Sequence, residues 1–237
     1  MNVRASFPDR EPIKLTVHDF QLLRGFGTLD DYWTIELIDG ELWGGLSEDG
    51  EEPETDAVAP IGLTASQYEL LARSESFIDY HKTELIEGVV YPMSPQHRPH
   101  GFVKDELAYR LRRALEAMNS PLRIATEQSV ALGRNSQPQP DIILTTEPRG
   151  DGAIPGPSIA LIVEVADSTA AFDLKRKRAI YAAAGISEYW VVDVNKRSVR
   201  RLWDLQDGFY EARSDHNFGD PVAAATLEGL AIGTDGL

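Results

Sequence analysis

Residues 159–194 read IALIVEVADSTAAFDLKRKRAIYAAAGISEYWVVDV, and this stretch decides the fold class. Its first eight residues, 159–166, form an apolar run that is typical of a strand buried on both faces. A helix is expected over about 172–184, ending at Gly185, a residue type that often follows the last turn of a helix. EYWVVDV, residues 188–194, predicts a further buried strand. A strand, a helix and a strand in this order predict an α/β fold with a central mixed sheet flanked by helices.

Two acidic residues interrupt the predicted strands of this region. Glu164 lies inside the apolar run, and Asp141 follows Pro140 in a strand expected over 139–145. An unpaired carboxylate is costly to bury, so each of these residues needs a partner, a metal ion or a proton. An ion pair or an exposed strand end would explain either residue without any catalytic function.

Lys177 lies on the apolar side of the predicted helix 172–184, whereas Lys175 points roughly to the opposite side. The residues that share the face of Lys177 at helical spacing are Ile180, Tyr181 and Ala184. In one interpretation the lysine simply extends its amine into water. In the other, a right-handed crossover lays the helix on the sheet and directs Lys177 toward the ends of the Asp141 and Glu164 strands.

Taken in order, these elements resemble the PD-(D/E)XK nuclease superfamily, and within it a large bacterial family of restriction-endonuclease-like proteins. The resemblance covers about residues 63–205. It rests on the motifs TELIEGVVYPMSP, His100, PQPDIIL, LIVEVADST and FDLKRKRAIYAAAGISEYWVVDV. The superfamily pattern has a lysine at position 166, where this chain has Ala166. In the resembled family the following helix supplies the lysine, and Lys177 matches that position.

The resemblance implies an endonuclease that hydrolyses phosphodiester bonds of DNA with Mg²⁺ or Mn²⁺. It implies that Asp141, Glu164 and the carbonyl of Val165 hold the metal ion, and such hard oxygen ligands suit Mg²⁺. Lys177 would complete the catalytic centre, and Glu84 matches the upstream glutamate of the family. The ion would activate a water molecule for attack on the scissile phosphate.

Further side chains are candidates for the site, each with a structural alternative. A long helix is expected over 98–119, with an apolar stripe that begins at Phe102. His100 would line the site at the start of this helix, and Tyr181 would line the site or belong to the core. Four basic side chains either contact phosphates or are simply solvated: Arg110, Arg113, Lys175 and Arg176.

The net charge of −15 weakens the argument for a nucleic-acid substrate. Residues 1–90 carry 6 basic and 19 acidic side chains, whereas residues 91–204 carry 16 basic and 13 acidic ones, so the candidate centre lies in the least acidic part. Two alternatives stay open. The chain is a catalytically inactive binding or regulatory module on the same fold, or it is a metal hydrolase of small phosphate substrates.

An internal similarity marks the N-terminal part of the chain. Residues 15–43 and 63–91 share 10 identities in 29 positions, and each reads as a short helix, a turn and a strand. The segment 44–60 between them is acidic and rich in Gly and Pro, which predicts a flexible linker. The expected organisation is an N-terminal extension over 1–43, the linker 44–60, a nuclease domain over 61–212 and a C-terminal tail over 213–237.

Location and partners follow from what the sequence lacks. The first residues are charged where a secretion signal needs apolar ones, and no apolar run approaches the roughly 18 residues that cross a membrane. The chain has no Cys, which excludes disulfides and thiolate metal sites. We expect a cytoplasmic homodimer that acts on DNA and has no membrane partner.

Overall fold

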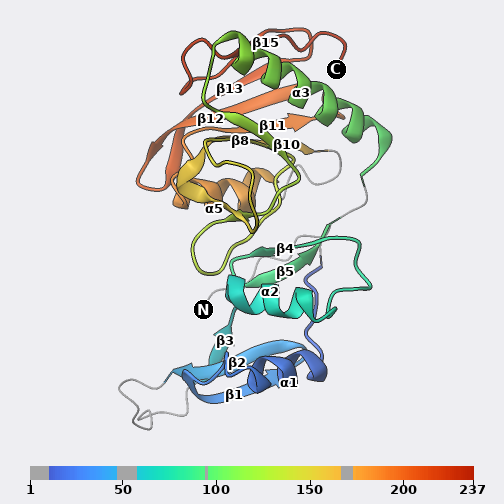
Figure 1. Cartoon of the computed structure of the whole chain (residues 1–237), viewed down its shortest axis with the longest axis vertical. Coiled ribbons are helices and arrows are strands. Elements are labelled where there is room, and N and C mark those ends of the chain that lie inside the picture. The colour runs from blue at the N-terminus through green and yellow to red at the C-terminus, as the bar shows by residue number, and fades with distance from the viewer. Residues whose placement is uncertain (1–10, 47–57, 94–95, 167–172) are drawn as a thin grey trace. The chain divides into compact units, whose positions relative to one another are not determined.

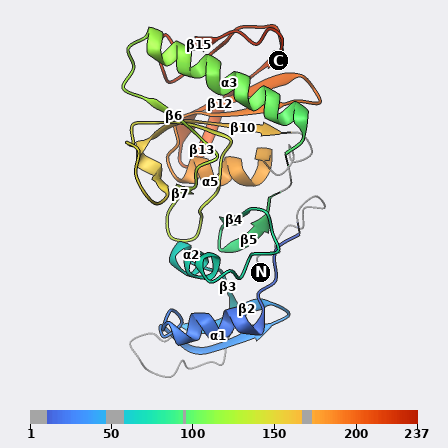
Figure 2. The same cartoon turned by 45° about the vertical axis from the view of Figure 1, so that its right-hand side comes forward.

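The computed structural model describes residues 11–46, 58–93, 96–166 and 173–237. The chain divides into two compact units, which are drawn from two sides in Figures 1 and 2. The first unit is Met1–Ser94 together with Arg134–Ser136, and the second is Pro95–Gly133 together with Gln137–Leu237.

The second unit is built on a six-stranded sheet in the order β13-β12-β11-β10-β8-β6. Its strands are β6 (Arg123–Thr126), β8 (Ile142–Thr145), β10 (Ile159–Ala166), β11 (Tyr189–Asp193), β12 (Ser198–Gln206) and β13 (Phe209–Asn217). β10 and β11 run parallel, and the other neighbouring strands are antiparallel. The expected mixed α/β sheet is therefore confirmed.

Helices flank both faces of this sheet. The long helix α3 (Arg98–Ala117) packs Leu107, Leu111 and Leu115 into the core formed with the strands. The connection from β10 to β11 contains a π-helical turn, η2 (Asp173–Lys177), which continues into α5 (Arg178–Ala183). Both views place α3 and α5 on opposite sides of the sheet (Figures 1 and 2).

The first unit has its own small core, which includes Leu23, Leu71 and Leu85. Its elements are α1 (Val17–Gly25), β1 (Tyr32–Ile38), β2 (Glu41–Leu46), β3 (Ala59–Ile61), α2 (Ala65–Arg73), β4 (Thr83–Ile86) and β5 (Val89–Pro92). Both helices begin after a threonine capping box, at Thr16 and at Thr64. The two similar segments thus take the same order of helix, strand and strand. The last residues of β2 and the first residues of β3 fall inside the segment 44–60 that was expected as a linker. Residues 47–57 lie outside the described residues.

The C-terminal segment 213–237, expected as a tail, contributes to the core of the second unit. It contains the end of β13 and the pair β14 (Val222–Ala223) and β15 (Ala231–Ile232), and Val222, Leu230 and Ile232 are buried there. The remaining elements are β7 (Val130–Ala131), β9 (Ile154–Pro155) and the 3-10 turn η1 (Gly156–Ser158). In the part of the chain that the structure describes, no helix is long and apolar enough to cross a membrane.

Candidate active site

Asp141 and Glu164 come together because their strands are neighbours. Ile142 of β8 faces Val163 of β10 in the antiparallel pairing, so continuing the register by one residue places Asp141 opposite Glu164. Directly opposite side chains lie on the same face of a sheet, with Cβ atoms about 4.5–5.5 Å apart. The two residues are only 7% and 4% exposed. Two buried carboxylates on the same face of neighbouring strands form a candidate cation site.

Hydrogen bonds hold both oxygens of Asp141. Nε2 of His100 lies 3.0 Å from Oδ1 of Asp141, and the backbone N–H of Val165 donates to Oδ2 at 2.8 Å. His100 is the third residue of α3, so the start of this helix lies beside Asp141, the residue that precedes β8. The structure thus brings together three residues that the sequence had assigned to the site.

Glu164 is held from the helix that follows it. The amine of Lys177 donates to Oε1 of Glu164 at 2.9 Å, and the hydroxyl of Tyr181 donates to the same oxygen at 2.7 Å. Lys177 is 3% exposed, whereas Lys175 is exposed on the same π-helical turn. Isolated π-helical turns occur often at functional sites. The cation beside Glu164 is therefore Lys177, from the helix face that the apolar spacing indicated.

The backbone carbonyl and the backbone N–H of Val165 are directed to the same side of β10. The carbonyl of Ala166 accepts a hydrogen bond from the N–H of Val194, on the β11 side of β10. Successive residues of a strand direct their backbone groups to opposite neighbours. The carbonyl of Val165 is thus directed to the β8 side, where the N–H of Val165 already binds Asp141. The register of β10 thus directs a backbone oxygen to the side of the strand on which Asp141 lies.

The donor set fits a hard divalent cation. Within the described ranges, no group of three or more His, Cys, Asp or Glu side chains is arranged to hold a metal ion. The candidate donors here are two carboxylates and one backbone carbonyl, and Mg²⁺ prefers such oxygen ligands, completed by water. Each carboxylate has about four lone pairs that can accept hydrogen bonds or bind a cation. The hydrogen bonds described above do not use all of them, so both carboxylates can still bind a cation.

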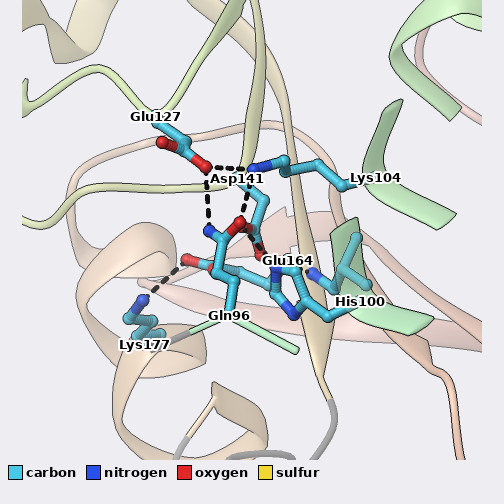
Figure 3. Close-up of polar contacts among 8 residues, drawn as sticks. Gln96, His100, Lys104, Glu127, Asp141, Glu164 and Lys177 are labelled. Atoms are coloured by element: carbon cyan, nitrogen blue, oxygen red, sulfur yellow. Dashed lines mark hydrogen bonds and ion pairs between the residues drawn. The ribbon is translucent and has the colours of Figure 1, made fainter. Parts of the chain in front are cut away.

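A second polar cluster lies one turn further along α3 (Figure 3). Lys104 donates from Nζ to Oε1 of Gln96 at 2.7 Å and forms an ion pair with Glu127. Nε2 of Gln96 donates to Oε1 of Glu127 at 2.8 Å, so the three side chains bind one another in a triangle. Lys104 is 7% exposed, which makes it a second buried lysine close to the site.

Sequence reasoning missed Lys104 because it built the buried face of this helix from apolar residues alone. Val103, Leu107, Leu111 and Leu115, all expected on that face, are buried, whereas Phe102, also expected there, is 75% exposed. Lys104 follows Val103 and precedes Leu107 by three residues, a spacing that places it on the same buried face. A lysine within a buried stripe was the signal that identified Lys177, and it would have identified Lys104 as well.

Among the four predicted phosphate contacts, Arg110 has a different role. Its guanidinium donates to Glu106 and to the carbonyls of Gly233 and Asp235, at 2.7–2.8 Å. These bonds hold the C-terminal segment on α3, so the Arg110 side chain is engaged within the protein, and its contact with a phosphate stays a prediction.

The other predicted residues differ in their surroundings. Arg113 lies over the ring of Tyr109, and Lys175 is exposed while Arg176 is half-buried. Glu84 is fully buried on β4 of the first unit. Its part in the catalytic centre stays a prediction.

An open groove of about 1040 Å³ borders the edge strand β6. Its lining includes Thr126 and Gln128, the two neighbours of Glu127 in the chain. Its basic side chains are Arg112, Arg123 and Arg149, and its acidic ones are Glu116, Glu147 and Asp151. No hydrogen bond or ion pair engages the three arginine side chains in the described part of the chain. The groove thus carries three available guanidinium groups, and its lining reaches Thr126, which pairs with Ile142, the residue after Asp141.

Comparison with known protein families agrees with this geometry. The family model described as "Uma2: Putative restriction endonuclease" matches residues 65–235. The chain belongs to the Uma2 family. The Uma2 match spans Asp141, Glu164 and Lys177, and it places the chain among nuclease-like proteins of the PD-(D/E)XK superfamily, as the motifs indicated.

A solved structure, that of "a putative nuclease belonging to DUF820 from Anabaena variabilis ATCC 29413", is also similar to this Uma2 chain. The two share 14% sequence identity with a TM-score of 0.49, over 66% of this chain and 89% of the other. No match was found among curated proteins.

Proposed function

We propose that this Uma2 protein is a metal-dependent endonuclease that hydrolyses phosphodiester bonds of DNA with Mg²⁺ or Mn²⁺. Membership of a restriction-endonuclease family supports the reaction class and a nucleic-acid substrate. The observation that carries the proposal is the register of β8 on β10, which places Asp141 opposite Glu164, together with the bond from Lys177 to Glu164. The homodimer and the cytoplasmic location expected from the sequence stay predictions.

The residues of the candidate centre are proposed to have three roles: binding the metal ion, orienting a metal ligand and stabilising negative charge. Asp141, Glu164 and the carbonyl of Val165 would hold the ion, which when bound supplies a Lewis acid and a more acidic water molecule. His100 and the amide of Val165 fix the orientation of the Asp141 carboxylate. Lys177, which is bonded to Glu164, would supply a positive charge near the negative charge that develops on the phosphate, and this charge would stabilise the transition state.

The proposal is tested by the metal dependence of cleavage. The purified protein is expected to nick or cut plasmid DNA with Mg²⁺ or Mn²⁺ and to lose this activity when EDTA is added. Cleavage that survives chelation would contradict the metal mechanism. Binding of Mn²⁺ and of DNA without cleavage of any DNA tested would favour the alternative, a binding or regulatory module.

The groove along β6 supports a path for one strand of the substrate. Arg112 lies twelve residues after His100 in α3, which is about 18 Å along the helix axis. At about 3.4 Å per phosphate along one strand, this distance corresponds to about five phosphates from the reacting one. Because the acidic side chains of the groove confine the attraction for phosphate to the three guanidinium groups, we expect weak binding with a salt dependence of about three phosphate contacts.

Substituting Arg123 tests this path, because the same sheet offers a matched control. Arg123 is exposed on the edge strand β6, and Arg213 is exposed on the opposite edge strand β13. Arg123→Ala is expected to weaken DNA binding and to lower the slope of log K against log salt by about 0.7–0.9, the value for one phosphate contact. Arg213→Ala is expected to leave the slope unchanged. Fluorescence anisotropy of labelled DNA in EDTA measures both, and equal slopes would exclude the groove as the path.

A further inference from the structure

The cluster of Lys104, Gln96 and Glu127 lies outside the candidate metal site, yet it is connected to Asp141 at two points. We propose that the cluster positions Asp141 and thereby sets the affinity of the site for its metal ion. The inference rests on the proposed function, because it takes Asp141 as a metal ligand.

The first connection is through the backbone. The N–H of Glu127 donates to the carbonyl of Asp141 at 3.2 Å, and Gln139 donates from Nε2 to the carbonyl of Glu127 at 2.7 Å. Glu127 has a φ of +52°, in the left-handed region. Residues other than Gly adopt that region rarely, and they keep it where their surroundings impose it. The contacts of the Glu127 side chain therefore influence the place of the Asp141 backbone.

The second connection is through helix α3. Lys104 follows His100 by four residues, so both side chains lie on one face of the helix. Lys104 binds Glu127, and Nε2 of His100 lies 3.0 Å from Oδ1 of Asp141. The contacts close a ring from Asp141 to Glu127, Lys104, the helix, His100 and back to Asp141. Figure 3 shows these side chains turned toward one another. The same ion pair thus restrains both the backbone and the carboxylate of Asp141.

Stability alone does not explain a charged pair at this place. Apolar side chains of similar volume often stabilise a protein as well as a buried ion pair does, because burying two charges is costly. Side chains that orient metal ligands, in contrast, commonly change metal affinity by about 10–100-fold when they are substituted. Gln96 binds both partners of the pair and so fixes its geometry.

The experiment measures Mn²⁺ binding by calorimetry on the full chain, together with the melting temperature of the metal-free protein. Lys104→Met removes the charge at similar volume and is expected to raise the Kd for Mn²⁺ by about 10–100-fold. It is also expected to lower the melting temperature, because it removes one partner of a largely buried ion pair, so the Kd is measured at a temperature where the variant is folded. The control is Lys196→Met, which breaks the ion pair of Lys196 with Asp193 and is expected to leave the Kd unchanged.

A double-mutant cycle separates positioning from independent effects. His100→Ala is also expected to raise the Kd, and the double variant with Lys104→Met is expected to lose less than the sum of both, because the two residues belong to one ring. Additive losses would overturn the ring, since they would show that the two residues act separately. Glu127→Gln carries the same test if Lys104→Met does not fold.

The outcomes distinguish this inference from the proposed function. A Lys104→Met variant with the parent affinity for Mn²⁺ and a lower melting temperature would show that the pair is structural, and the inference would be wrong. A parent protein that binds Mn²⁺ without cleaving DNA contradicts the nuclease proposal alone, because the effect on Kd is still measured. A parent protein that binds no Mn²⁺ overturns both.

Discussion

Replacing Lys177 with methionine is expected to lower the rate of DNA cleavage by at least about a hundredfold, the scale of removing one electrostatic group from a reaction centre. Lys177 is 3% exposed and donates to Glu164 at 2.9 Å, so its charge acts with little screening by water. Methionine keeps the volume and apolar stem of the side chain. The rate is measured in single turnovers with saturating Mn²⁺, which separates the chemical step from product release.

Lys175→Met is the matched control for this substitution. Lys175 lies two residues earlier and is exposed, so its loss is expected to change only the affinity for DNA and its salt dependence. Removing one partner of a buried ion pair costs about 3–5 kcal/mol of stability, so the melting temperature of the Lys177 variant is measured as well. If the folded Lys177 variant cleaves at the parent rate while the Lys175 variant is inactive, the assignment of the helix face is wrong.

Asp141→Asn is expected to remove Mn²⁺ binding in calorimetry and to reduce cleavage to background. The substitution removes one of the two carboxylates proposed to bind the ion. Substituting residues that only orient metal ligands lowers metal affinity by about 10–100-fold, and the loss from Asp141→Asn should exceed this range. Asparagine retains a side-chain carbonyl oxygen that can accept a hydrogen bond from the N–H of Val165. The side chain at position 141 therefore keeps one of the two contacts that Asp141 makes, with Val165 and with His100. The loss is therefore expected to reflect the missing charge more than a rearranged strand.

Asp193→Asn provides the control in the same sheet. Asp193 ends β11, is 8% exposed and accepts hydrogen bonds from the backbone and side chain of Lys196 at 2.8 and 2.9 Å. The same chemical change at similar burial is expected to leave Mn²⁺ affinity unchanged. Equal losses from the two variants would show that metal binding does not depend specifically on Asp141.

Local elements of this protein follow from the order of its residues. The apolar run 159–166 forms β10 over Ile159–Ala166, because such a run is buried on both faces of a sheet. The turn at Asp207-Gly208 joins β12 and β13 with φ values of +49° and +78°, and a type I′ hairpin turn requires positive φ at both of its central residues. The place of Lys177 on the buried helix face is equally local, since it depends only on the spacing within one helix.

Other features depend on which segments become neighbours. The pairing of β8 with β10 puts Asp141 opposite Glu164, and the start of α3 brings His100 to Asp141 across 41 residues of sequence. The bond of Lys104 to Glu127 spans 23 residues of sequence. The spacing of residues within α3 does not indicate which residue Lys104 binds. The apolar spacing of a segment determines which side it buries. The strand or helix that covers this side is determined only when the chain packs. The hydrophobic effect is non-directional and does not select a particular partner, and hydrogen bonds between two segments form only once the segments are neighbours.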